Sequence, residues 1–513
     1  ASGLQINPQD FMNGELVFKR MEGVDSTVIN SGMINAAAGG NVALLGARVE
    51  NRGLISAKLG MVALASGREA VLTFDESGIL GVQVDEAVLQ EELGEAAAVV
   101  NSGNIHAESG RVLLSASTTR DVFSSAVNWG DQKQARSVTY DEDGGFTLGA
   151  GGDISNSGTI NVSGTDSGTV IVVADNIEHS GKIGANATKG RAGEIELHSA
   201  NTTKLTESGI VSANAEMGGE IKLLGKNVGL FDGANVEAKG VDGGGVILIG
   251  GDREGLNPKI RNADFVFVGE AASIDTSSTH VGDGGRAIIF AEDTARIYGT
   301  VYAKGGDKGG DGGFVETSGK RSFAVDHAPD VSAAKGSSGH WLIDPYNLTI
   351  SSSRDSQEFQ DPDEVPPFVS ASITSNLRVE TLEDALNAGG IVTIKTGDGE
   401  GDEGGQEGDI TISSDISINP DDDVTLNIIA HNDINIHSSI QAFGSNSLNL
   451  HMNANVSAEQ NGFGSVSFAN SPAIRTNGGD FKIAQITDNS VNADQPGAYN
   501  IELNNLTIDI DAG

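Results

Sequence analysis

One phrase is written three times near the start of the chain, as NSGMINAAAGGNVALLG from Asn30, NRGLISAKLGMVALASG from Asn51 and NSGNIHAESGRVLLSAS from Asn101. The second and third copies align without a gap, so that Ile55 stands opposite Ile105. The first copy aligns with them after a one-residue gap in a turn. Because self-similarity at a regular spacing is the signature of a repeat architecture, it takes precedence over any single motif.

Weaker copies of the second half of the phrase continue down the chain. Each has a glycine followed by a short apolar run. The apolar residues that we align are Val170, Ile195, Ile221, Val246, Ala287, Val315 and Trp341.

Each copy contains short runs, such as GLISA and MVALAS, that alternate apolar with small or polar residues. This period of two is typical of a strand with one buried face. A unit of about 20–27 residues cannot bury that face alone, but neighbours stacked at about 4.8 Å bury it continuously. The pattern therefore predicts an all-β solenoid, a parallel β-helix with small loop and helix excursions. A sandwich or propeller is the alternative, but Asn-Gly and Asp-Gly pairs occur at the spacing of the repeat rather than of hairpins.

The chain is strongly acidic. Its 513 residues include 71 Asp and Glu against 32 Lys and Arg, a formal net charge of −39. Such a chain repels nucleic acid and anionic lipid but attracts divalent cations. We therefore expect no nucleic-acid partner.

Cysteine is absent, which excludes disulfide support and suits a protein that stays unfolded until export. No apolar run is long enough for a membrane span, and no signal peptide is apparent. The opening ASGLQINPQDF lacks a methionine, so we expect a fragment of a longer or processed protein.

The chain resembles the two-partner-secretion exoproteins, the filamentous-haemagglutinin-like adhesins of Gram-negative bacteria. The pairing of GGFVETSGK with LIDPYNLTI is the most specific part of this resemblance. The stretches that carry it are 10–18, 28–67, 71–88, 99–117, 243–252, 309–320, 341–352 and 382–399. Within the family, the acidic and cysteine-free character is most like the CdrA-type biofilm matrix adhesins, which bind exopolysaccharide.

The resemblance implies that the β-helix is right-handed. It also implies passage through an outer-membrane transporter of the TpsB type, folding outside the cell, and a place on the cell surface or in the extracellular matrix. The implied organisation is 1–120 as the end of the secretion domain, 121–350 as the main β-helix, 351–390 as a loop and short-helix excursion, and 391–513 as β-helix of altered style.

Two excursions are expected from local pattern. Residues 82–100 have a partly helical period, which predicts a protruding β-hairpin or short helix. TLEDALNAGG, residues 381–390, predicts a short helix with a threonine cap and a glycine stop, packed on the solenoid.

The best metal candidate is the loop TGDGEGDEGGQEGD, residues 396–409. Asp398, Glu400 and Asp402 alternate on a glycine-rich segment, and Asp409 lies nearby. Hard oxygen ligands at alternating positions suit Ca²⁺. The alternative is a solvated acidic loop, and we expect no other cofactor.

Enzymes built on β-helices need clustered carboxylates with basic groups. Asp421–Asp423 with His431 is the nearest approach, but an Asp run after Pro favours a solvated turn. The histidines show no zinc spacing and are expected on the polar surface. We expect Trp341 in the core. Candidate sugar platforms are Trp129, Tyr140, Tyr298, Tyr302 and Tyr499.

These observations favour an extracellular rod-like adhesin over an enzyme. It would mediate attachment between cells or to a matrix, with an exopolysaccharide or a neighbouring cell surface as partner. The alternatives are a polysaccharide-cleaving enzyme on a β-helix, or the stalk of a contact-dependent toxin or haemolysin delivery protein.

Overall fold

The computed structural model describes most of the chain. The described residues are 1–74, 80–86, 88, 93–94, 96–116, 139–140, 146–147, 151–206, 208–231, 233–353, 375–397, 406–454, 464–483, 500–503 and 507–509. They form two compact units. The first unit comprises Ala1–Gly240, Gly245–Gly251 and Leu256–Ala263, and the second comprises Val241–Gly244, Asp252–Gly255 and Asp264–Gly513.

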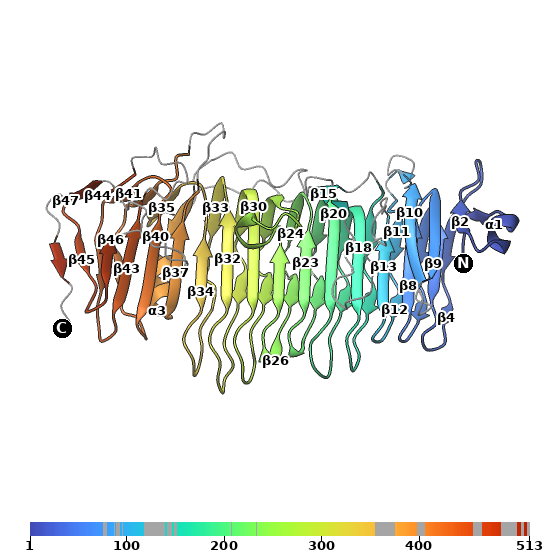
Figure 1. The fold of residues 1–513 in the computed structure, drawn as a ribbon, viewed down its shortest axis with the longest axis horizontal. Helices are drawn as coiled ribbons and strands as arrows, with labels where there is room; N and C mark the ends of the chain where they lie inside the picture. The colour runs from blue at the N-terminus through green and yellow to red at the C-terminus, as the bar shows by residue number, and fades with distance from the viewer. Residues whose placement is uncertain are drawn as a thin grey trace. The chain divides into compact units, whose positions relative to one another are not determined.

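Each unit is a parallel β-helix, in which strands of successive coils lie side by side (Figure 1). This confirms the predicted fold class, while the handedness and the four predicted segments stay predictions. No helix among the described residues is long and apolar enough to cross a membrane.

Strands of the first unit line three sides of each coil. Two sides merge in the long strands β18 and β20. The strands of these two sides are β3 (Thr27–Asn30), β5 (Val42–Gly46), β6 (Arg48–Asn51), β8 (Met61–Ser66), β11 (Val99–Asn101), β13 (Arg111–Ser115), β16 (Ile154–Asn156), β18 (Thr169–His179), β20 (Glu194–Leu205), β23 (Glu220–Leu224), β24 (Asn227–Leu230) and β27 (Val246–Ile249). The third side holds β4 (Met33–Asn35), β7 (Leu54–Ser56), β12 (Asn104–His106), β17 (Thr159–Asn161), β19 (Lys182–Gly184), β21 (Ile210–Ser212) and β25 (Asn235–Glu237).

The repeat in the sequence is the register of the strands. Ile55 pairs with Ile105, and Ile105 with Ile160, with every one of these side chains fully buried. Val62 pairs with Val112 in the same way. Like side chains therefore stack coil on coil, and each one removed from water contributes about 1.5–3 kcal/mol.

One predicted alignment is wrong by a single residue. The sequence placed Val246 opposite Ile221, but Ile221 pairs with Ile247, which is fully buried while Val246 is partly exposed. Because side chains alternate between faces, a slip of one residue exchanges the inward and outward sets. Three consecutive glycines precede this run and leave its register open in the sequence.

An antiparallel sheet accompanies the first coils. It consists of β1 (Gln5–Ile6), β2 (Leu16–Lys19), β9 (Glu69–Phe74) and β10 (Leu80–Glu86), with helix α1 (Pro8–Met12) after β1. Its side chains Leu80, Val82 and Val84 pack in one apolar cluster with the outward-facing Ala63 and Leu113. A hairpin is present, formed by β9 and β10, but it shares only residues 82–86 with the predicted segment 82–100 and packs against the coils instead of protruding.

Buried asparagines link the coils of the first unit. Asn30, Asn51, Asn101 and Asn156 lie at equivalent turns, and each side-chain amide donates to the oxygen of the next at 2.7–2.8 Å. Asn156 ends the ladder on the buried ring of His179, 2.9 Å from Nδ1. Each amide thus satisfies its neighbour, as buried polar groups require.

The second unit has the same architecture, and its later coils have a separate sheet on each of their three sides. Its strands are β29 (Ser273–Asp275), β30 (Arg286–Ile297), β31 (Thr300–Tyr302), β32 (Phe314–Gly319), β33 (Ser322–Val325), β34 (His340–Ile343), β35 (Leu348–Ser351), β36 (Asn376–Arg378), β37 (Gly390–Lys395), β38 (Ile410–Ile412), β39 (Ile416–Ile418), β40 (Val424–Ile429), β41 (Ile434–Ile436), β42 (Ile440–Ala442), β43 (Leu448–Asn453), β44 (Ser465–Phe468), β45 (Ala473–Arg475), β46 (Phe481–Ile483), β47 (Asn500–Leu503) and β48 (Thr507–Asp509). Further strands of the chain are β14 (Thr139–Tyr140), β15 (Phe146–Thr147), β22 (Ala215–Met217), β26 (Gly240–Gly243) and β28 (Ala263–Val268).

The predicted short helix is present as α3 (Val379–Asn387), which buries Leu382 and Leu386. The predicted threonine cap is wrong. The helix begins after Arg378, whose side chain makes no capping bond, and the hydroxyl of the buried Thr381 donates to the carbonyl of Asp326 at 3.2 Å. Gly389, with φ at 93°, provides the expected stop.

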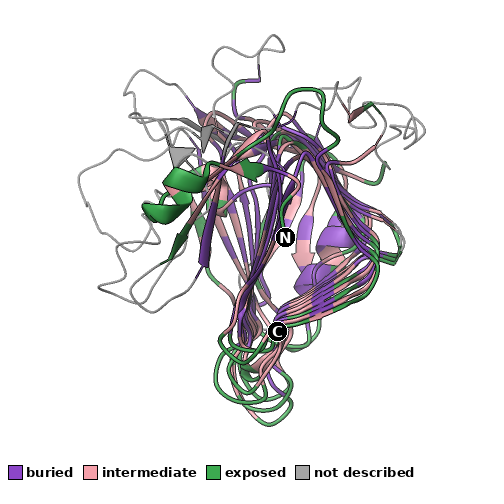
Figure 2. Cartoon of the chain, turned by 90° about the vertical axis from the view of Figure 1, so that its right-hand side faces the viewer, coloured by how far each residue is buried: buried purple, intermediate pink, exposed green. Residues whose placement is uncertain are grey.

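Burial follows the coil geometry throughout the described residues. Buried residues lie along the strands and exposed residues at the turns (Figure 2). Some strands also have buried side chains on their outward side, and the outward side of β32, β34 and β37 holds charged ones.

Candidate functional site

The predicted calcium loop lies only partly within the described residues. Asp398, Glu400 and Asp402 fall outside them, and Asp409 falls within. The Oδ1 atom of Asp409 accepts from the side-chain amide of Asn432 at 2.8 Å and from the backbone N–H of Asp433 at 3.0 Å. Asp409 therefore joins one coil to the next. Across the described ranges, no group of three or more Asp, Glu or His residues is arranged to hold a metal ion.

The Asp421–Asp423 run has the geometry of a solvated turn. All three residues are exposed. Asp423 accepts from the backbone N–H and hydroxyl of Ser447 in the following coil, at 2.8 and 2.9 Å. These bonds lower the pKa of Asp423, which therefore stays ionised and links two successive coils at this turn.

The aromatic candidates divide between core and surface. Trp341 is fully buried, as predicted, and its indole N–H donates to the hydroxyl of Thr317 at 2.9 Å. Tyr298 is half-buried and packs edge-on against Phe267, with ring centroids 6.1 Å apart. Tyr302 is also half-buried. Trp129 and Tyr499 lie outside the described residues, as does the side chain of Tyr140.

Two histidines contradict the expectation of a polar surface position. His179 is fully buried at the end of the asparagine ladder, and burial lowers its pKa. His198 is 2% exposed and lies 3.0 Å from Oε1 of the buried Glu196. The sequence missed both because an imidazole in a strand is polar by composition, whereas its burial depends on the coils around it.

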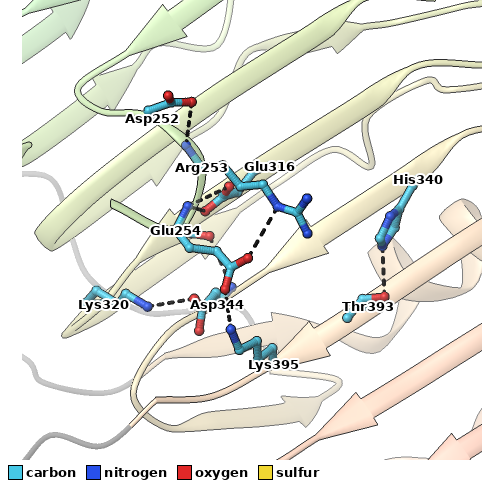
Figure 3. A network of polar contacts seen from close by, with 10 residues as sticks. Asp252, Arg253, Glu254, Glu316, Lys320, His340, Asp344, Thr393 and Lys395 are labelled. Carbon is cyan, nitrogen blue, oxygen red and sulfur yellow. Dashed lines mark hydrogen bonds and ion pairs between the residues drawn. The ribbon is translucent and has the colours of Figure 1, made fainter. Parts of the chain in front are cut away.

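A cluster of charged side chains lies on the outward side of β32, β34 and β37 in the second unit. We call it the charged cluster. It consists of Arg253, Glu254, Glu316, Lys320, Asp344 and Lys395, and Figure 3 shows that these side chains converge.

The strand register explains how three of these residues come together. Glu316 lies opposite Leu342 on the neighbouring strand, and Leu342 lies opposite Thr393. Alternation then places Asp344 and Lys395, two residues further along β34 and β37, on the same outward side as Glu316. Spacing by whole coils therefore gathers residues that are far apart in the sequence.

A short 3-10 segment, η1 (Arg253–Gly255), covers Glu316. The backbone N–H of Glu254 donates to both carboxylate oxygens of Glu316, at 3.1 Å each. Glu254 adopts the left-handed conformation with φ at 55°, which is uncommon for a residue other than glycine. Its carboxylate pairs with Lys395 and, at 3.3 Å, with Nε of Arg253.

Asp344 and Lys320 form the second pair of the cluster. Nζ of Lys320 lies 2.6 Å from Oδ2 of Asp344, and the exposed fractions of the two side chains are 14% and 1%. The ring of Phe290 lies beneath the amine, with its centroid 5.8 Å from Nζ. The pair is therefore enclosed by protein.

Burial perturbs the acids of the cluster. It raises the pKa of Glu316 to about 8, so that this carboxyl is largely protonated near neutral pH. Burial likewise raises the pKa of Asp344 against the attraction of Lys320. Glu254 shows the opposite net shift. Burial is the largest single influence on it, but the hydrogen bond to Lys395 and the positive charges of Lys395, Arg253 and Lys320 together lower its pKa.

A neighbouring polar contact borders the cluster. Burial and then the positive charge of Arg253 lower the pKa of His340 to about 4, and its Nε2 lies 2.8 Å from the hydroxyl of Thr393. The neutral ring packs edge-on against Phe314, with centroids 5.2 Å apart. Arg253 lies over the other ring of this contact, 5.1 Å from the centroid of Phe314.

The cluster combines amines, carboxylates and one protonated carboxyl within a site that η1 covers. Such a set can exchange protons among its own members. The sequence did not predict it. A signal was present in FVETSGK, where Glu316 and Lys320 occupy outward positions of a run whose aligned copies carry apolar residues such as Ile288.

Comparison with known proteins gives structural likenesses and no sequence match. The chain is similar to the crystal structure of the HMW1 secretion domain from Haemophilus influenzae, with 22% sequence identity, a TM-score of 0.41, and coverage of 66% of this chain and 72% of that one. No family model and no curated protein matches the chain.

Proposed function

We propose that the protein is an extracellular adhesin exported by two-partner secretion, and that it attaches cells to one another or to a matrix by binding exopolysaccharide. The sequence resemblance to filamentous-haemagglutinin-like proteins, the β-helix fold and the lack of cysteine support this proposal. An outer-membrane transporter of the TpsB type is its partner during export.

The observation that carries the binding role is a strip of half-exposed polar side chains on adjacent coils of the second unit. Thr425 and Asn427 face outward from β40, and Asn449 and His451 face outward from β43. Nδ1 of His451 lies 3.2 Å from Oδ1 of Asn427, and Asn427 donates to Thr393 at 3.1 Å. A flat row of amides and hydroxyls suits shallow hydrogen bonding to sugar hydroxyls.

The net charge of −39 narrows the class of polysaccharide. Because like charges repel, an anionic polysaccharide needs a divalent cation to approach this protein, whereas a neutral one does not. The expected ligand in the absence of divalent cations is therefore neutral or cationic, not anionic.

Binding of the purified chain to immobilised neutral and anionic polysaccharides, with and without Ca²⁺, tests the proposal. We expect retention on a neutral polysaccharide that weakens when Asn427 and Asn449 are both changed to alanine. The control is Asn104→Ala, at an exposed position of the first unit. Failure to bind any polysaccharide would contradict the binding role, and release of new reducing ends or unsaturated sugars would favour a polysaccharide-cleaving enzyme.

A further inference from the structure

Lys320 and Asp344 are positioned for a covalent bond between their side chains. Lys320 follows the last residue of β32 and Asp344 follows β34, and these strands pair in parallel, so the two residues belong to adjacent coils. Their contact of 2.6 Å brings the amine beside the carboxyl carbon. A bond between them would join one coil to the next through side chains.

The hydrogen bonding of Asp344 is incomplete in a way that suits this reaction. Its Oδ2 meets Lys320, but its Oδ1 has no hydrogen-bond partner among the described residues, although the residue is only 1% exposed. Its backbone N–H is held by the hydroxyl of Ser318 at 3.1 Å, which fixes the chain at this point. A buried carboxylate that serves only as an ion-pair partner normally has both oxygens satisfied.

Glu316 is the proton source that we assign to the pair. Glu316 lies on β32, four residues before Lys320, and is fully buried. Burial and the negative charge of Asp344 both raise the pKa of Glu316, so its carboxyl carries a proton at neutral pH. An amine, a carboxyl and a protonated carboxyl are thus enclosed together, where little water competes with the amine.

We propose that Lys320 and Asp344 form an intramolecular isopeptide bond. Nζ of Lys320 attacks Cγ of Asp344, a C–N bond forms, and one C–O bond of the carboxyl group breaks. The two protons that the ammonium group loses leave with that oxygen as one water molecule. Glu316 gives a proton to the departing oxygen and recovers one from the nitrogen, so no oxidant or other reactant is consumed.

The surroundings distinguish this pair from other lysine–carboxylate contacts. In the first unit Lys222 contacts Glu194 at 2.6 Å and Glu220 at 3.1 Å. Although burial opposes it, the negative charges around Lys222 raise its pKa. Two carboxylates share the ammonium group there, and among the described residues neither has a buried oxygen without a hydrogen-bond partner, unlike Asp344. Lys304 and Asp330, at 3.4 Å, are 44% and 36% exposed, so water surrounds them.

Mass spectrometry of the whole chain tests the proposal. The denatured protein is expected to weigh less than its sequence by the mass of one water. Trypsin digestion is expected to give a branched peptide that joins residues 309–321 to residues 336–354, because the modified Lys320 resists cleavage. A folded protein with the unreduced sequence mass, or a bond located at Lys395 and Glu254 instead, would overturn the proposal.

Variants assign the roles. Lys320→Arg keeps the charge and Asp344→Ala removes the carboxyl, and both are expected to abolish the loss of water. Glu316→Gln is expected to abolish or strongly slow it with the circular dichroism spectrum unchanged. Lys304→Arg, the matched control, is expected to retain it in full. If Lys320→Arg still loses water while remaining folded, the bond is elsewhere and the proposal is wrong.

Discussion

The asparagine ladder of the first unit gives the sharpest test of what joins the coils. Asn101 is fully buried in the middle of the ladder, where it accepts from Asn51 at 2.8 Å and donates to Asn156 at 2.7 Å. Truncation to alanine removes both bonds. It leaves a donor on Asn51 and an acceptor on Asn156 without a partner in a place that water cannot reach.

The magnitude follows from the two groups that lose their partners. Each buried polar group left unsatisfied costs about 1–3 kcal/mol, so Asn101→Ala is expected to lower the free energy of unfolding by about 2–6 kcal/mol. The matched control is Asn104→Ala, at an exposed position three residues away. A surface change of that kind is expected to stay within about 0.5 kcal/mol of the parent.

Urea unfolding followed by circular dichroism measures the difference, and amide hydrogen exchange locates it. Because coils interact mainly with their neighbours, faster exchange is expected in β6, β11 and β16 and not in distant coils. If Asn101→Ala is no less stable than Asn104→Ala, or if exchange rises uniformly, the ladder does not hold the coils together and the reasoning fails.

Three further predictions follow from the structure. The pKa of Glu316 rises from 4.5 to about 8 on folding, so its contribution to stability is complete below pH 4.5 and is lost as the pH rises to 8. Urea unfolding of Glu316→Gln across this range is expected to lack that decline, which amounts to at most about 1.4 kcal/mol per pH unit. Gly103→Ala is expected to destabilise by about 1–3 kcal/mol or more in the same assay, because the new Cβ would overlap the backbone of Gly53 in the preceding coil. Finally, a calcium site in residues 396–409 predicts a higher melting temperature in millimolar Ca²⁺ than in EDTA, and equal values would exclude a stabilising site.

Much of the fold could be predicted because residues at equivalent positions of the repeat contact one another in neighbouring coils. Aligning Ile55 with Ile105 predicts which strands pair, on which side of the coil they lie and which side chains are buried. The prediction failed where no distinctive residue fixed the alignment of one copy with the next. Glycines before Val246 allowed two registers, and only contact with Ile221 in the preceding coil decides between them.

The charged cluster could not be predicted from the same pattern. Its members come from four separate segments, namely η1 and the ends of β32, β34 and β37, and the residue that covers it, Glu254, belongs to no repeat. Coil spacing alone aligns Glu316 with Leu342 and Thr393 on an outward face. One charged, one apolar and one polar residue in that row do not indicate a charged cluster. The cluster is buried because η1 docks over it, and no pattern in the sequence predicts that docking. Buried His179 escaped notice because its burial depends on the coils around it.

The energetics of the cluster favour a covalent bond at Lys320 and Asp344 over a permanent ion pair. Removing two charges from water costs several kcal/mol for each ion, and a buried pair often fails to recover this cost. Here Asp344 leaves one oxygen unsatisfied, which adds to the cost. An amide carries no charge, so its formation removes the ionic desolvation from the folded state. Lys395 would then keep Glu254 as its partner, and η1 would remain docked over a neutral cross-link between two coils.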